Sequence, residues 1–497
     1  MISKNHLSFN DWLKTQQIPK LSKKKIHELD KKIKRKILLE LNTFKKLDVF
    51  EYNLYLKQFE VKDKISKYDK GEIEWVKKLI WKPKNSTDYR GDFRRIYPEL
   101  LFCGNEFTIQ SKDIFGNDSI TVHTDNEPLL RHWNILRLLV SRAPDDGTVG
   151  RQFRYIVRDK ETKKYLGIIC LSSDMVDTPQ RNEALGIGKS LRKLNSIGLQ
   201  WNNTANGQTI VPTQPFGKYF LGGKLLSLLC LSDEVCSMWK KLYGDTLVGV
   251  TTTSLYGTKN VKASTQYDGL TPMWKSFGQS AGGTPFQLSR YLTKEVKEWC
   301  RVTRPKVFYD HFPNRMREGK KRFFGKIFRD FKIPTIKTVS NFKRNVYFSR
   351  IYKETDIYCQ NILKVFSRVA IKEKVVSNKD NKILLHKDKI TNELKNKLQT
   401  KTKEILKLEQ VPDDKLTPAF DNSIKSLTEH WKFGWAGDTK KVSPDLLKKY
   451  GKDVRRMVKG RVDTSDIFKE PIQLSGKGID WYEDLSKLSW EEIKKKY

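Results

Sequence analysis

The sequence predicts an α/β core flanked on both sides by basic, mainly helical regions. The central part of the 497-residue chain alternates strand-like runs, such as TLVGVTTTSLYG, with apolar stretches at helical spacing. Strands that alternate with helices indicate an α/β architecture, and a chain of this length has room for two or three domains. On either side of the core, lysine and arginine become frequent. We therefore predict four regions, at 1–90, 91–295, 296–410 and 411–497.

Residues 1–90 are predicted to form a basic helical arm. The stretch LSKKKIHELDKKIKRKILLELNTFKKL repeats apolar residues at helical spacing, with basic residues between them. Residues 1–48 contain 13 Lys and Arg against 5 Asp and Glu. Two explanations stay open: a solvated amphipathic helix that packs on the main body, or a surface that binds nucleic acid or a protein.

The region 91–295 is predicted to hold the strands. RQFRYIVRDKETKKYLGIICLSSD indicates two strands joined by a polar turn at 159–164. TLVGVTTTSLYG predicts another strand, because valine and threonine favour a pleated surface. Helices are expected at 190–197 and 222–230. Together these elements predict a core of about 200 residues.

The region 296–410 is predicted to be basic, aromatic-rich and helical. Residues 301–350 contain 15 Lys and Arg against 3 Asp and Glu. In GKKRFFGKIFRDFKI, at 319–333, a helix places the phenylalanines on one side and the cations on another. We expect this helix to contact nucleic-acid phosphates; a membrane-surface helix and an ordinary core-facing helix are the alternatives. The predicted nucleic-acid-binding residues are Lys320, Lys321, Arg322, Lys326, Arg329, Lys343 and Arg344.

The last region, 411–497, is rich in tryptophan and tyrosine. Such a composition is too aromatic for a plain disordered tail. We expect a small C-terminal module or a clamp that packs on the body. The residues concerned are Trp431, Trp435, Trp481, Tyr482 and Trp490.

The charge of the chain predicts a polyanionic partner. The formal net charge is +38, and nucleic acid, DNA or RNA, is the commonest polyanion that basic proteins bind. No run of about 18 apolar residues predicts a membrane span, and the first residues lack the apolar segment of a secretory signal. The six cysteines contain no C-x-x-C pair and are predicted to be reduced core residues. We expect a cytoplasmic protein, in the host cytoplasm if a phage encodes it, with no membrane partner.

Two adjacent glycines stand at the predicted start of the helix 222–230. Backbone amides at a helix N-terminus form an anion site, because they coincide with the positive end of the helix dipole. Gly222 and Gly223 would provide this site, and Lys218 and Lys224 would add full charges. The alternative is that glycine lets the helix pack closely on the sheet. On the anion hypothesis, alanine at position 223 should cost the fold little.

The order of these elements resembles that of two known families. The predicted order is a strand, a glycine-opened helix, a second strand and a tyrosine-bearing helix that ends in Phe-Gly, and this order resembles that of the GNAT acyltransferases. Over roughly 150–290, the succession VGRQFRYIVRD, YLGIICLSSD, RNEALGIGKS, TTTSLYGT and YDGLTPMWKSFGQSAGG resembles the DruA family of anti-phage and mobile-element proteins. That family in turn resembles the GNAT enzymes and the Mom DNA-modification protein of phages. The resemblance implies a GNAT-like core and acetyl-CoA or a related thioester as cofactor, its pyrophosphate held at the Gly222–Gly223 entrance.

Polar residues at predicted strand ends are the candidate catalytic groups. The GNAT resemblance implies that Tyr256 or Tyr267 protonates a leaving thiolate; aromatic packing is the alternative for both. Ser254 lies where the strand 246–254 ends, a place where open α/β sheets often carry catalytic groups. Asp174 follows another predicted strand and is a candidate base. Asn202 and Asn203 are predicted either to bind a base edge or cofactor or to form a turn.

Acidic residues near His123 are the candidates for a metal site. Carboxylate clusters can hold Mg²⁺ for phosphodiester cleavage. We nevertheless interpret the segment FGNDSITVHTDNE as a turn, a strand and a second turn with surface acids, and we predict no metal. The residues considered are Asp113, Asp118, His123, Asp125, Glu127, Asp310 and His311.

The sequence as a whole predicts a nucleic-acid-binding protein of a phage or mobile element. The mechanistic hypothesis is a GNAT-like transferase that adds an acyl or aminoacyl-type group to a nucleobase amine. One alternative is a non-catalytic DNA- or RNA-binding scaffold in defence or in other mobile-element biology. The other is a metal-dependent nuclease or transposition protein. Other phage or defence proteins are possible partners.

Overall fold

The computed structural model describes most of the chain, with gaps. The described residues are 8–82, 96–108, 121–125, 127–144, 150–175, 177–187, 190–213, 217, 222–256, 265–268, 270–280, 288–311, 318–333, 343–379, 382–385, 391–420 and 485–496.

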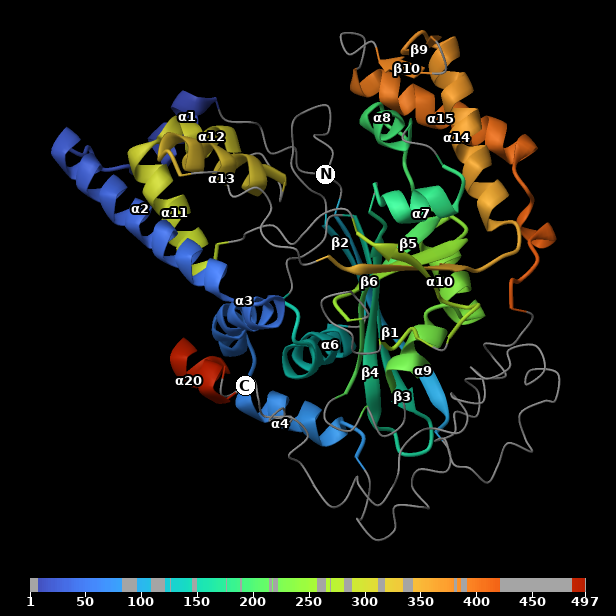
Figure 1. Cartoon of the computed structure of the whole chain (residues 1–497), viewed down its shortest axis with the longest axis horizontal. Helices are drawn as coiled ribbons and strands as arrows, with labels where there is room; N and C mark the ends of the chain where they lie inside the picture. Colours follow the sequence, from blue (N-terminus) through green and yellow to red (C-terminus); the bar gives the residue numbers. More distant parts are fainter. Residues whose placement is uncertain are drawn as a thin grey trace.

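An eight-stranded sheet forms the centre of the molecule (Figure 1). Its strands lie in the order β2-β1-β3-β4-β5-β6-β8-β7. Neighbouring strands are antiparallel except β5 and β6, which are parallel. The strands are β1 (Pro98–Thr108), β2 (Thr121–Asp125), β3 (Gly150–Asp159), β4 (Tyr165–Ser173), β5 (Thr204–Pro212), β6 (Gly249–Ser254), β7 (Lys275–Gln279) and β8 (Asn345–Arg350).

This mixed sheet with its helices confirms the predicted α/β class. β3 and β4 are the two strands predicted around the turn at 159–164, and the amide of Asp159 donates to the carbonyl of Lys164 at 2.9 Å. The predicted helices at 190–197 and 222–230 are α8 (Ser190–Ser196) and α9 (Gly222–Leu229). β8 was not predicted, and it lies in the sheet beside β6, so the sheet continues well past residue 295. The predicted helix that ends in Phe-Gly is wrong at its end, because these two residues belong to β7, which pairs with β8.

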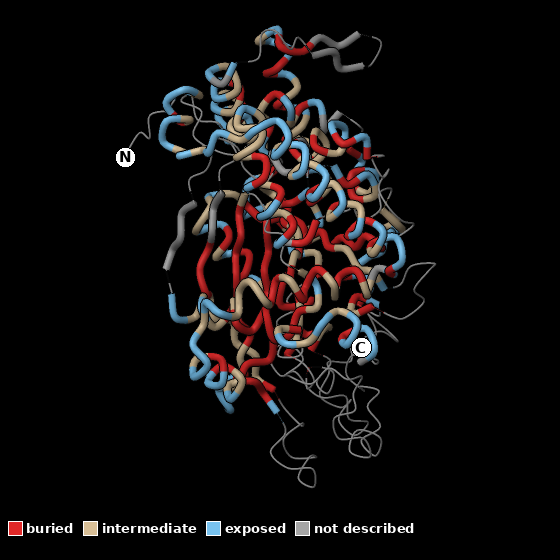
Figure 2. Tube along the Cα trace, turned by 90° about the vertical axis from the view of Figure 1, so that its left-hand side faces the viewer, coloured by how far each residue is buried: buried red, intermediate tan, exposed pale blue. Residues whose placement is uncertain are grey.

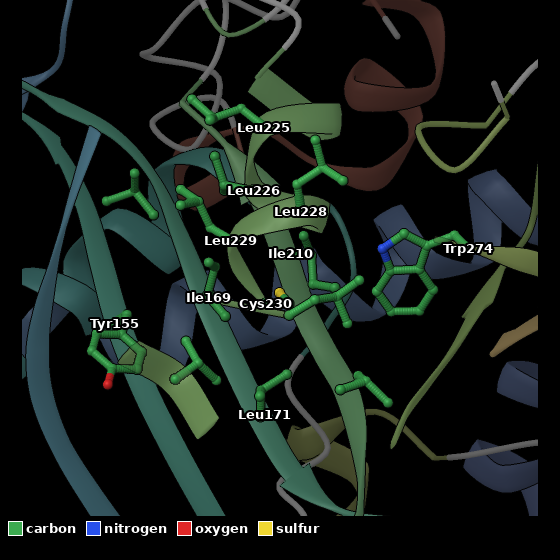
Figure 3. Packing of buried hydrophobic residues seen from close by; sticks show 14 of the residues in the cluster. Tyr155, Ile169, Leu171, Ile210, Leu225, Leu226, Leu228, Leu229, Cys230 and Trp274 are labelled. Atoms are coloured by element: carbon green, nitrogen blue, oxygen red, sulfur yellow. The ribbon is translucent and has the colours of Figure 1, made fainter. Parts of the chain in front are cut away.

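One face of the sheet is covered by α9 and α10 (Asp233–Tyr243). α10 begins after Ser232, whose hydroxyl accepts from the amide of Val235, and it ends at Gly244 in the left-handed conformation that favours glycine. Leucines of α9 pack on Ile169, Leu171 and Ile210 of the central strands (Figure 3). The central strands are buried along most of their length (Figure 2).

A second hydrophobic cluster joins α4 (Lys70–Leu79) and α6 (Glu127–Val140) to the sheet. Val76 and Leu136 are fully buried there, together with Ile156 of β3 and Ile168 of β4. A third hydrophobic cluster contains residues of α8, α14 (Thr355–Lys372) and α15 (Asn392–Glu409), together with the residue that ends the short helix α7 (Pro179–Ala184). β9 (Val376–Lys379) and β10 (Lys382–Leu385) form a separate two-stranded sheet.

A buried group of charges joins α3 (Val49–Lys64) to α6. Glu60 is 1% exposed and accepts ion pairs from Lys57 at 3.1 Å, Lys64 at 2.9 Å and Arg137 at 3.7 Å. Burial alone would raise the pKa of Glu60, but the three cations outweigh it and lower the pKa to about 2. Burial lowers the pKa of Lys57 to about 7, against the attraction of Glu60.

The two basic segments predicted to flank the core pack against each other. α2 (Lys23–Lys46) lies along α11 (Arg290–Thr303), and one hydrophobic cluster joins them to α13 (Glu318–Asp330) through residues such as Ile37, Val296 and Phe323. α1 (Phe9–Thr15) and α12 (Pro305–His311) complete this helical unit. Figure 1 shows the unit to one side of the sheet.

The end of the chain contacts its beginning. In α20 (Trp490–Lys496), the Trp490 ring lies 5.1 Å from that of Tyr55. Gln58 and Lys62 of α3 both donate to the carbonyl of Leu488, at 2.9 and 3.1 Å. The aromatic residues predicted to form a C-terminal module at Trp431, Trp435, Trp481 and Tyr482 lie outside the described residues.

Two further expectations can be compared with this fold. All six cysteines are buried and free, as the prediction of reduced core residues requires. Within the described ranges, no helix combines the length and the apolar character that a membrane crossing needs.

Candidate functional site

The parallel strands β5 and β6 stay paired over only three residues. Residues 204–206 pair with 249–251. Beyond them β5 continues along β4 to Pro212, and β6 continues along β8 to Ser254. The described strands therefore separate toward their carboxyl ends, and the connection after β5 leads into α9. In open α/β sheets, ligands bind outside the carboxyl ends of strands at such a change of direction.

Two side chains donate hydrogen bonds to β5 beyond the residues at which its backbone pairs with β6. The Thr252 hydroxyl of β6 donates to the carbonyl of Gly207 at 2.9 Å. The Gln266 amide, from the segment after β6, donates to the carbonyl of Ile210 at 3.2 Å. Because an unpaired buried carbonyl is costly, these contacts stabilise the separated strands.

Tyr267 is enclosed beside this opening. Its phenol oxygen lies 3.3 Å from the Thr252 hydroxyl and 3.0 Å from the Gln266 amide nitrogen. Its ring lies 4.8 Å from that of Tyr347 and 5.0 Å from that of Trp274. Burial raises the pKa of Tyr267 well above its usual range. A phenol in this environment keeps its proton. Tyr267 could therefore protonate a leaving group only after the residues around it had moved.

A second polar group connects the same segment to β8. The Tyr347 phenol donates to the Asp268 carboxylate at 3.1 Å and accepts from Thr265 at 3.1 Å and from Asn345 at 3.0 Å. Burial raises the pKa of Tyr347. The Lys224 ammonium donates to the Asp268 backbone carbonyl. The loop 265–268 is thereby joined to α9, β6 and β8.

The glycine-opened helix α9 begins at Gly222, as the sequence predicted, and it lies beside the loop 265–268. Lys224 lies in the first turn of this helix. A Cβ atom at Gly223 would lie 2.9 Å from Gln266 Cβ and 2.8 Å from its Oε1. The expectation that alanine there costs the fold little is therefore wrong, because Gln266 already occupies the space. Lys218 lies outside the described residues.

Ser254 and Tyr256 lie where β6 ends. The Ser254 hydroxyl accepts from the amide of Tyr256 at 3.1 Å, which closes a local turn. The Tyr256 side chain is 40% exposed, and its ring lies 5.2 Å from that of Phe50 at the start of α3. Tyr256 is therefore the accessible one of the two candidate tyrosines.

Asp174 belongs to a buried ion pair. Its Oδ2 lies 2.5 Å from the Arg181 guanidinium, and both side chains are inaccessible to solvent. The same oxygen accepts from the hydroxyls of Thr204 at 2.7 Å and Thr251 at 2.9 Å. The network ties the end of β4 to α7, β5 and β6. These contacts hold the strands together and leave Asp174 poorly placed to act as a base.

Asn202 and Asn203 lie before β5, at the opposite end of that strand from α9. The Asn203 amide donates to the carbonyl of Thr246 at 2.9 Å, which holds the approaches to β5 and β6 together. The Asn202 carbonyl accepts from Arg151 at 3.3 Å, and Arg151 also pairs with Asp245. Both asparagines thus make the contacts of a connecting segment.

The predicted catalytic residues therefore fall into three places. Thr251 and Thr252 are adjacent in β6 and point to opposite faces of the sheet; Thr251 contacts Asp174, whereas Thr252 contacts Tyr267. Asp174 and Tyr267 are thus on opposite faces. The structure brings together Gly223, Lys224 and Tyr267, with Ser254 and Tyr256 at the end of the neighbouring strand. It separates all of them from Asn202 and Asn203.

The predicted nucleic-acid-binding helix is α13, and its apolar side is buried, as the core-facing alternative predicted. Phe323, Ile327 and Phe331 pack in the helical unit. Lys326 lies 3.8 Å from Asp330, and Arg329 is exposed. Lys343 is exposed, and the backbone amide of Arg344 donates to Ser280 at 3.1 Å. The side chains of Lys320, Lys321 and Arg322 lie outside the described part.

The residues considered for a metal site are only partly described. Asp113 and Asp118 lie outside the described ranges, as do the side chains of His123, Asp125 and His311; Asp310 pairs with Lys306 at 3.1 Å. Within the described part of the chain, no three His, Cys, Asp or Glu side chains come together as a metal site would require.

Sequence reasoning missed the residues that organise the opening. Gln266, Asp268 and Tyr347 make most of its hydrogen bonds, and Arg181 neutralises Asp174. The segment QYD around Tyr267 was the available signal for Gln266 and Asp268. Tyr347 had none, because its strand follows a long basic segment whose pattern favours helices.

The comparisons with known proteins agree with part of this picture. A family profile described as "Druantia protein DruA" matches residues 121–357. These residues include β2 to β8 and the whole opening between β5 and β6. Residues 121–357 are a DruA-like region. This region extends past residue 295, where the predicted core ends, and it includes β8.

A curated protein supports the DruA-like assignment. "Druantia protein DruA" of Escherichia coli (strain UMEA 4076-1) is 26% identical over 189 residues, which is 36% of this chain and 45% of that protein. The chain therefore aligns with less than half of this relative's length. No solved structure matches significantly. The helical unit formed by α1, α2 and α11 to α13 lies only partly within the DruA-like region.

Proposed function

We propose that this chain is a DruA-type anti-phage defence protein that binds a polynucleotide. The observation that carries the proposal is its net charge of +38. Solubility of a small domain calls for a net charge of about 2 to 8. A larger cationic excess repels itself in the folded state and attracts polyanions, of which nucleic acid is the commonest inside cells.

The DruA-like region supports the defence role. It includes β2 to β8 and the opening between β5 and β6, so the part of the chain that resembles DruA is also the part that offers a candidate site. A defence protein that acts on an invading genome must contact a polynucleotide, for which the basic flanks supply the charge.

Filter binding of the full chain at several salt concentrations tests this proposal. We expect binding to mixed-sequence polynucleotides with little sequence preference. Each phosphate contact should add about 0.9 to the slope of log affinity against log salt, so six or more contacts give a slope steeper than about −5. Affinity that stays constant between about 50 and 200 mM salt would contradict the electrostatic basis.

A second candidate function is transfer of an acyl-type group by a GNAT-like core. The separation of β5 and β6 beside the glycine-opened α9 favours it, because the order strand, helix, parallel strand is the one that resembles GNAT enzymes. The contacts of Tyr267 and Asp174 favour the non-catalytic scaffold instead, since both candidate groups are enclosed in structural hydrogen bonds.

Acetyl-CoA distinguishes these two candidates. If it binds the native state, it should raise the melting temperature with ligand concentration, and at 100 times its Kd the gain in unfolding free energy is about 2.7 kcal/mol. Nucleosides from cells expressing the chain should then carry a new mass. Unchanged melting up to millimolar acetyl-CoA, together with unmodified nucleosides, would favour the scaffold.

A further inference from the structure

The solvent-facing side of α2 carries cations without ion-pair partners. Lys25 pairs with Glu28 at 3.6 Å, and Lys36 pairs with Glu295 of α11 at 2.5 Å. Among the described residues, no carboxylate lies within 4 Å of the other basic side chains of this helix. These are Lys23, Lys24, Lys31, Lys32, Lys34, Arg35, Lys45 and Lys46.

Four of these cations project away from the side of α2 that is buried. Ile33 and Ile37 pack in the helical unit, and Phe44 packs against Tyr52 of α3. At about 100° per residue, Lys31 and Arg35 fall opposite these residues. We call the solvent-facing row formed by Lys24, Lys31, Arg35 and Lys46 the α2 strip; all four residues are exposed. At 24 residues, α2 is about 36 Å long, and it forms the outer edge of the helical unit (Figure 1).

The free protein keeps these cations close together. Lys31 lies four residues from Arg35 and three from Lys34, and Lys32 lies three from Arg35. Like charges at these spacings are neighbours on a helix and destabilise it. A bound polyanion relieves this repulsion. The α2 strip is therefore better suited to bind a polyanion than to stabilise the fold.

The surroundings of the strip indicate which polyanion it fits. Binding of single-stranded nucleic acid uses aromatic side chains on which bases stack, whereas the large exposed apolar residue of α2 is Leu39. Insertion into an anionic membrane surface needs a free apolar face, and that face of α2 is buried against α11 and α13. A straight row of cations fits a rigid rod of phosphates, such as duplex DNA with about one charge per 1.7 Å.

We propose that the α2 strip binds the phosphate backbone of duplex DNA. This inference rests on the proposed polynucleotide binding and places it on α2. The helix that the sequence favoured, α13, offers Lys326 near Asp330 and turns its phenylalanines inward.

Two double variants of the full chain test the inference. Lys31→Gln with Arg35→Gln removes two unpaired cations of the strip. Lys25→Gln with Lys36→Gln removes two ion-paired cations from the same helix, so both variants lose the same net charge and keep a good helix former. The probe is a mixed-sequence 30-base-pair DNA duplex at several salt concentrations. The strip variant should lower the salt slope by about 1.8 and the affinity at ~0.1 M salt by roughly 10- to 60-fold.

The control variant should leave the slope within about half a unit of the native value. Equal losses in both variants would overturn the α2 strip while leaving polynucleotide binding intact. No binding by the native chain would overturn the proposed function itself. Tighter binding of a single strand or an RNA duplex, or strip-dependent binding to phosphatidylserine vesicles without DNA binding, would overturn the assignment to duplex DNA. Unchanged circular dichroism in both variants shows that the helix is intact.

Discussion

Replacement of Arg181 by methionine is expected to lower the free energy of unfolding by about 3–5 kcal/mol. Arg181 and Asp174 are both inaccessible to solvent and lie 2.5 Å apart. Without the guanidinium, the Asp174 carboxylate stays buried with only the Thr204 and Thr251 hydroxyls and the amide of Met175 as donors. Urea unfolding followed by circular dichroism measures the loss.

Two further variants show whether burial is the cause. Arg368→Gln breaks an exposed pair with Glu409 and should cost no more than about 1 kcal/mol. Adding Asp174→Asn to Arg181→Met removes the unpaired charge and should recover part of the stability, since neighbouring mutations in one network are not additive. A loss for Arg181→Met as small as that for Arg368→Gln would show that the network does not tie the strands together.

Replacement of Glu60 by glutamine is expected to destabilise the joint between α3 and α6 by about 3–5 kcal/mol. Glu60 is the partner of Lys57, Lys64 and Arg137, and the side chains of Lys57 and Arg137 are 0% and 7% exposed. Glutamine keeps the shape but leaves these cations buried without a counter-charge. Urea unfolding at pH 7 measures the effect, with Glu298→Gln, in a surface pair with Arg301, as the control.

The same group predicts a dependence of stability on pH. The pKa of Glu60 is lowered to about 2 in the folded protein, below its unfolded value, so its contribution is present above about pH 4.5 and is lost as the pH falls toward 2. That contribution is about 3 kcal/mol. A native chain that loses stability toward pH 3 no faster than the Glu60→Gln variant would contradict this assignment.

Lys57 makes stability depend on pH in the alkaline range. Its folded pKa is lowered to about 7, so between pH 7 and its unfolded pKa the unfolded chain binds more protons and stability rises with pH. The native chain should therefore gain on the order of 1–3 kcal/mol over Lys57→Met between pH 7 and 9.5. A constant difference across that range would mean that Lys57 stays charged.

The sequence located the region of the candidate site better than its chemistry. The glycine-opened helix, the strand TLVGVTTTS and the two tyrosines were all found, because glycine placement and runs of β-branched residues are local signals. Their partners are non-local. Gln266 occupies the space beside Gly223, and Arg181 neutralises Asp174; neither contact follows from spacing along the chain.

The charge of the chain shows the same division. The composition by itself determined that the protein is strongly basic and that two segments, before and after the strands, carry the excess. Only the tertiary structure decided which cations stay free. α2 and α13 share one buried cluster, and carboxylates of α2, α11 and α13 pair with some of the cations, which leaves the outer row of α2 unpaired.

The sheet supplies the last example. Strand-like runs joined by a polar turn indicated the hairpin β3–β4, and the valines and threonines of TLVGVTTTS indicated the strand β6. The placement of β8 between β6 and β7 was decided by the tertiary structure alone. NVYFSR is short and follows a long basic segment, so its strand character depends on the hydrogen bonds and buried side chains that β6 provides. Local pattern determines which segments can be strands, and long-range pairing decides which of them join one sheet.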